Sequence, residues 1–121
     1  EFNTDLSKWA VSAVTDMDFM FLSASKFNAD LSKWDVSSVT SMGYMFSEAL
    51  SFNRDLSKWD VSSVTVMRNM FFGASGFKRE LCGAAWVNSK AYKAHLFLGS
   101  PGWISSACTS EPGNGEGYVL G

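Results

Sequence analysis

The sequence predicts an α/β solenoid, in which stacked coils each contain one short strand and one short helix. Three observations support this fold class. The stretch DLSKWDVSSVT occurs at 30–40 and again at 55–65, with a near copy at 5–15. The copies align on phenylalanines that recur every 25 residues, and periods of about 20 to 50 residues are typical of solenoids. Within each copy, a segment of alternating polarity precedes a segment with helical periodicity.

The alternating segment predicts a strand around 57–61 and at the equivalent positions of the other copies. Trp59 and Val61 would face one side, and Lys58 and Asp60 the other. Stacked coils would lay these strands side by side as a parallel ladder, about 4.8 Å apart. Burial of Trp and Val favours folding, whereas burial of charged columns is costly. We therefore expect two inward columns, Trp9, Trp34, Trp59 and Phe2, Phe27, Phe52, Phe77, and outward columns of Lys8, Lys33, Lys58 and of Ala10, Asp35, Asp60. An exposed tryptophan stripe that binds sugar rings is the alternative.

The second half of each copy predicts a short helix, capped by Thr40 or Ser41 in copy two. Its apolar residues follow the i, i+3, i+4, i+7 pattern of one helix face. They are Met17, Met20, Phe21, Ala24 in copy one, Met42, Met45, Phe46, Ala49 in copy two and Met67, Met70, Phe71, Ala74 in copy three.

The repeated FNxDL motif places Asn and Asp side chains just before each predicted strand. Such side chains bond to backbone amides in turns. The column Asp5, Asp30, Asp55 offers one carboxylate per coil, whereas calcium takes about six to eight oxygen ligands. A turn role is therefore favoured over a calcium site.

The composition excludes several classes of function. The chain has 121 residues, enough for one domain, and 46% of them are hydrophobic. A net charge of −2 argues against nucleic-acid binding, and no apolar run reaches transmembrane length. The single histidine, His95, has no accompanying nucleophile or acid–base set. We therefore expect no enzyme activity, no cofactor and no metal.

The slots that vary between the copies are the candidate binding positions. They carry Phe19, Tyr44, Arg68 and Phe72, on or near the outer side of the predicted helices. Aromatic residues and Arg most often dominate interface energy, so these four are the predicted partner-binding residues. Scattered surface aromatics without a function are the alternative interpretation.

The repeat FNxDLSKWDVSSVTxMxxMFxxAxxFN resembles the 25-residue unit of the BspA-like leucine-rich repeat surface proteins, also known as DUF285. The resemblance covers residues 1–77 almost letter for letter. It implies a right-handed solenoid related to leucine-rich repeats, found in secreted or surface proteins. It also implies a role in adhesion or protein interaction rather than catalysis.

The C-terminal third departs from this repeat. We divide the chain into three repeats (1–76), a degenerate fourth repeat with a C-terminal cap (77–108) and a Gly-rich tail or linker (109–121). The segment beginning LCG at 81–83 is similar to the terminal segment of some family members, in which a second Cys follows about one coil later. This similarity implies a disulfide between Cys82 and Cys108, stabilising by about 3–4 kcal/mol and indicating an oxidising compartment. Two buried free thiols are the alternative.

These arguments lead to one functional expectation and one alternative. We expect a non-catalytic protein-interaction or adhesion module, either at the cell surface, secreted, or as a small accessory subunit of a larger assembly in a lumen. The partner would be another protein or a component of the surface or matrix. The alternative is a solenoid that binds ice, carbohydrate or calcium, and the column Thr15, Thr40, Thr65 is its only ice-binding signature.

Overall fold

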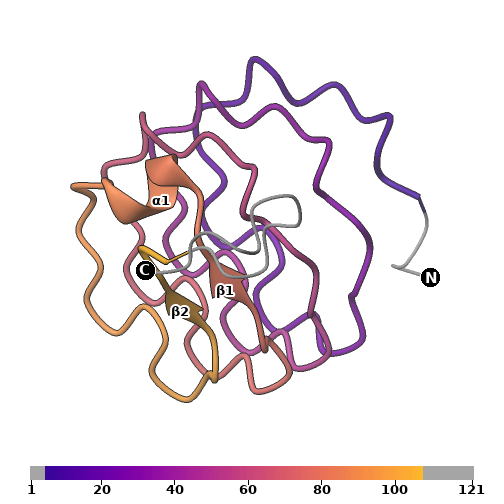
Figure 1. Ribbon diagram of the computed structural model, residues 1–121. Helices are drawn as coiled ribbons and strands as arrows, with labels where there is room; N and C mark the ends of the chain where they lie inside the picture. Colours follow the sequence, from indigo (N-terminus) through magenta and orange to yellow (C-terminus); the bar gives the residue numbers. More distant parts are fainter. Residues whose placement is uncertain (1–4, 108–121) are drawn as a thin grey trace.

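The chain winds in successive coils that lie one beside the next (Figure 1). This computed structural model describes residues 5–107; residues 1–4 and 108–121 lie outside the description. Isolated parallel bridges join the coils at Asp16↔Ser41, Ser41↔Val66 and Val66↔Tyr92. Regular elements are few: β1 (Glu80–Leu81), α1 (Ala84–Val87) and β2 (Trp103–Ile104). β1 and β2 pair in parallel, with Glu80 opposite Trp103 and Leu81 opposite Ile104.

The segments 15–24, 40–49, 65–74 and 91–100 form a continuous side of the molecule, here called the outer wall. Its backbone N–H groups alternate between two kinds of partner. In the first coil, Met17, Phe19 and Phe21 donate to carbonyls of the second coil, at 2.9, 3.0 and 2.8 Å. The intervening residues Met20 and Leu22 donate three residues back within their own coil. The wall is therefore a ribbon of β-turns that is hydrogen-bonded from coil to coil.

The predicted helices at these positions do not form. The backbone of each wall segment passes through positive φ every fourth residue, as at Phe19 (φ 63) and Ser23 (φ 58). A residue in that region interrupts a right-handed helix. An isolated helix of two turns is marginally stable, whereas the turn ribbon gains hydrogen bonds and packing from the neighbouring coil. The predicted sidedness is nevertheless confirmed, because Met42, Met45, Phe46 and Ala49 are all buried.

The predicted strands around 57–61 are also absent. Residues 57 and 58 form a turn instead, because the Asp55 Oδ1 accepts the Ser57 amide at 2.9 Å. Asp5 and Asp30 hold their coils in the same way, through Ser7 and Ser32. The predicted turn role of the aspartate column is thus confirmed. The isolated parallel bridges between coils lie in the outer wall rather than in this segment.

The asparagine side chains accept backbone amides as predicted, but the amides belong to the next coil rather than to a local turn. Asn28 Oδ1 accepts the Asn53 amide at 2.8 Å, and Asn53 Oδ1 accepts the Lys78 amide at 2.9 Å. Each side-chain oxygen therefore holds the next coil at the same register.

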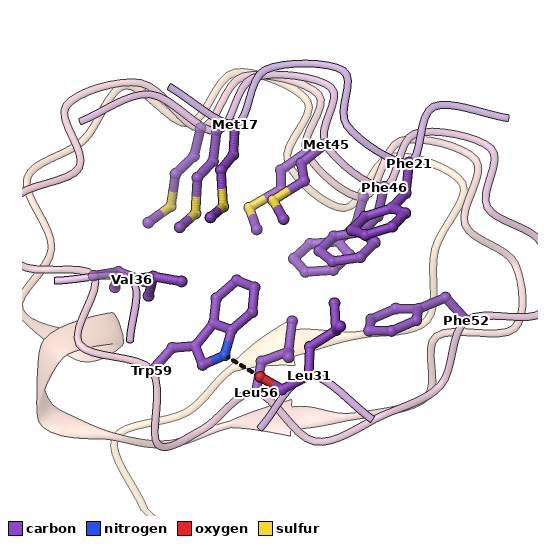
Figure 2. Packing of buried hydrophobic residues seen from close by; sticks show 14 of the residues in the cluster. Met17, Phe21, Leu31, Val36, Met45, Phe46, Phe52, Leu56 and Trp59 are labelled. Atoms are coloured by element: carbon purple, nitrogen blue, oxygen red, sulfur yellow. Dashed lines mark hydrogen bonds between the residues drawn. The ribbon is translucent and has the colours of Figure 1, made fainter. Parts of the chain in front are cut away.

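The core is built from columns of identical side chains (Figure 2). Phe27, Phe52 and Phe77 stack with ring centroids 5.7 and 5.9 Å apart, as predicted. A second column stacks beside them with centroids 5.4–5.5 Å apart: Phe21, Phe46, Phe71 and Phe97. The inner rings Phe46, Phe52 and Phe71 therefore contact both the coil before and the coil after their own, and neighbouring coils bury one another.

The tryptophan column adds a polar contact to this core. Trp59 Nε1 donates to the Leu31 carbonyl at 2.9 Å (Figure 2), and Trp34 donates to Leu6 in the same geometry. In the fourth coil the donor is Trp86 of α1, which bonds to the Leu56 carbonyl at 2.8 Å. Trp34 and Trp59 are buried as expected, but Trp9 is 50% exposed, which corrects its predicted burial. Trp9 stacks on Trp34 on one side only, because no described coil covers its other face.

Candidate functional site

The outer wall carries several exposed apolar side chains at positions that differ from coil to coil. Large exposed hydrophobic residues of the wall are Phe19 (53%), Leu22, Tyr92 (57%) and Leu98. Exposed apolar side chains that gather on one side of a protein often mark an interaction site. The outer wall is therefore the candidate functional surface.

Two of the predicted residues meet on this surface. The rings of Phe19 and Tyr44 stack with centroids 5.1 Å apart and an interplanar angle of 20°. Both residues have positive φ, and the same slot of the next two coils holds Asn69 and His95, also at positive φ. The turn ribbon thus fixes the backbone conformation at this slot. The side chains at the slot project from a backbone that the hydrogen bonds between coils hold in place.

A third predicted residue, Arg68, contacts an aromatic residue that the sequence reasoning missed. Its guanidinium carbon lies 5.9 Å from the centroid of the Tyr92 ring, within the range of a cation–π contact. The fourth predicted residue, Phe72, is half-buried and has no ring contact with the other three. Tyr92 occupies the slot of Val66 in the fourth coil. The fourth coil is shifted by one residue relative to the repeat, and this shift is visible in the sequence. An alignment that included the shift would have predicted Tyr92 on the wall.

Charge is distributed unevenly along the wall. In the first coil, Asp18 Oδ1 accepts the Gly43 amide at 2.7 Å and the Ser41 hydroxyl at 2.5 Å. In the later coils the wall carries Arg68 and Lys93. The Lys93 ammonium donates to the Ser89 carbonyl at 2.8 Å, and partial burial lowers the pKa of this group. An acidic end and a basic end give the surface a direction that a partner can recognise.

The predicted threonine column belongs to the inter-coil ladder. The Thr40 hydroxyl donates to the Thr15 carbonyl at 3.2 Å, and the Thr65 hydroxyl donates to the Thr40 carbonyl at 3.1 Å. The expected role of Thr40 as a helix cap is therefore wrong. These hydroxyls tie neighbouring coils together.

The remaining predicted site residues are the two cysteines. Cys82 follows β1 and is half-buried, and its amide lies 3.5 Å from the Ser57 hydroxyl. Cys108 lies outside the described residues, so the pairing of the two stays a prediction. Within residues 5–107, no group of three or more His, Cys, Asp or Glu is placed to hold a metal ion. The same part of the chain has no helix long and apolar enough to cross a membrane.

Coils linked at intervals of 25 and 26 residues define this chain as a repeat protein. It belongs to the family described as "Mycoplasma protein of unknown function, DUF285", which matches residues 1–103. No curated protein matches the chain. No solved structure matches it either.

Proposed function

We propose that this chain is a non-catalytic protein-interaction or adhesion module, and that the outer wall is its binding surface. The observation that carries the proposal is two inter-coil contacts on the wall: the Phe19 ring stacks on Tyr44, and the Arg68 guanidinium lies over the Tyr92 ring. Aromatic and Arg side chains that are already ordered lose little conformational entropy on binding.

The pattern of constant and variable positions in successive coils supports the same proposal. Core columns keep the same residue types in successive coils, whereas the wall slots change from Phe19 to Tyr44 to Asn69. A scaffold of this kind can alter its partner by changing surface residues without changing its core. We propose further that the coils form a right-handed solenoid of the BspA-like leucine-rich repeat type.

The proposed location is the cell surface, the secreted fraction or an oxidising lumen. It depends on the Cys82–Cys108 disulfide, which would tie the C-terminal segment to the fourth coil. Peptide mapping without reducing agent tests this directly. A linked pair of peptides supports the oxidising compartment, and two free thiols in protein from the native source contradict it.

Affinity capture from the native source tests the binding surface. The double variant Phe19→Ser/Tyr92→Ser removes two exposed rings and leaves the buried columns intact. Val87→Ser is the matched control, because Val87 is an exposed apolar residue of α1, away from the wall.

The partner should be recovered with the wild type and with the control and lost with the double variant. Removing residues that dominate an interface should weaken binding about tenfold or more for the purified partner. Equal affinity for all three proteins, each with an unchanged circular dichroism spectrum, would show that the outer wall is not the binding surface.

A further inference from the structure

A second surface, at the FNxDLSK end of the coils, forms a charged groove that is separate from the outer wall. Its first part has a volume of about 330 Å³ and is lined by Asp30, Ser32, Arg54, Asp55, Lys58 and Arg79. An adjoining part of about 280 Å³ shares Asp55 and Arg79 and continues to Lys78, Glu80 and Trp103. The groove therefore crosses successive coils and ends at β2.

Basic side chains outnumber carboxylates in the lining of this groove, with Arg54, Lys58, Lys78 and Arg79 against Asp30, Asp55 and Glu80. Asp30 lies near Arg54, but its Oδ1 accepts the Ser32 amide at 2.9 Å, and this bond is the main reason why the pKa of Asp30 is lowered. The excess of cations, together with a carboxylate oxygen that is already bonded to the backbone, favours binding of an anionic ligand.

The guanidinium groups are held in place by the backbone. Arg54 Nε donates to the Asn28 carbonyl at 2.8 Å, and Arg79 Nη2 donates to the Asn53 carbonyl at 2.9 Å. Each group keeps further N–H donors for a ligand. Because the guanidinium groups are already positioned, little conformational entropy would be lost in ordering them when a ligand binds.

Trp103 supplies an aromatic platform at the end of the groove. Its side chain is 51% exposed, although its amide donates to the Arg79 carbonyl at 3.2 Å as part of the pairing between β1 and β2. A rigid backbone under an exposed indole suits stacking against the C–H face of a sugar ring.

We propose that this groove binds an oligosaccharide that carries carboxylate groups. Guanidinium and ammonium groups would bind the carboxylates, Asp30 and Asp55 would accept sugar hydroxyls, and Trp103 would stack on one ring. The coil spacing of about 4.8 Å is close to the length of one pyranose unit, so successive coils can contact successive sugars. An extended acidic peptide fits less well, because its side chains on one face recur at about 6.8 Å.

Isothermal titration calorimetry with tetragalacturonic acid, on the full chain at low ionic strength, tests the proposal. Trp103→Ala should weaken binding about tenfold by removing the stacking platform. Lys58→Gln should weaken it about fivefold, and this difference should shrink in high salt because exposed charges are screened. In the part of the chain that the structure describes, neither side chain makes a hydrogen bond that holds the fold.

Two matched variants control for general effects. Trp9→Ala removes a tryptophan of similar exposure outside the groove, and Lys90→Gln removes an exposed lysine that does not line the groove. Both should bind like the wild type. The proposal is overturned if tetragalacturonic acid does not bind, or if the groove variants bind like the controls. Equal affinity for neutral cellotetraose would remove the carboxylate requirement, and tighter binding of a tetraglutamate peptide would assign the groove to acidic peptides instead.

Discussion

Replacing Trp59 with Phe should destabilise the chain by about 2.5 kcal/mol, because the indole N–H is bonded between coils. The Trp59 ring is 2% exposed, and its Nε1 lies 2.9 Å from the Leu31 carbonyl oxygen. Loss of the hydrogen bond should cost about 1 kcal/mol. Loss of the burial of two ring carbons should add about 1.6 kcal/mol.

Urea unfolding, followed by circular dichroism, measures this difference. With a typical slope of roughly 1–3 kcal/mol per molar urea, the midpoint should fall by roughly 1–2.5 M. Trp9→Phe is the matched control, since Trp9 occupies the same column, is half-exposed and donates no indole hydrogen bond within residues 5–107. It should change the stability by less than about 0.5 kcal/mol. Equal losses for the two variants would refute the role of the inter-coil bond.

Three further predictions concern the turn ribbon, the asparagine column and acid stability. Gly73→Ala should cost about 1–2 kcal/mol in thermal unfolding, because Gly73 has φ +68, unfavourable for residues with a Cβ. Asn53→Ala should cost about 1–2 kcal/mol by the same measurement, since it leaves the Lys78 amide without its acceptor. The Ser62 hydroxyl, and secondly the Ser62 amide, hold the pKa of Asp60 below its ordinary value of 3.8. This stabilisation is therefore present above pH 3.8 and lost as the pH falls through the lower folded value. Urea midpoints between pH 2 and 6 should fall less steeply in Ser62→Ala; identical slopes would exclude this contribution.

The candidate surface was only partly predictable from the sequence. The variable slots identified Phe19, Tyr44 and Arg68, because a position that changes while the core stays constant is free to face the solvent. Their contacts depend on how neighbouring coils align. The stacking of Phe19 on Tyr44 follows from the 25-residue register, but Arg68 meets Tyr92 only because the fourth coil is shifted by one residue.

By itself, the sequence determined which side chains enter the core and the distance along the chain between equivalent residues. Hydrophobic burial depends on side-chain type, so the columns of Met, Phe and Trp could be assigned from their spacing. Only the tertiary structure decided the backbone conformation. A pattern of i, i+3, i+4, i+7 places the same side chains on one face of a helix and on one face of this turn ribbon. The choice between them rests on hydrogen bonds to the neighbouring coil, such as that from Phe21 to the Met45 carbonyl, which no local segment contains. The exposure of Trp9 was decided in the same way, by whether another coil packs against it.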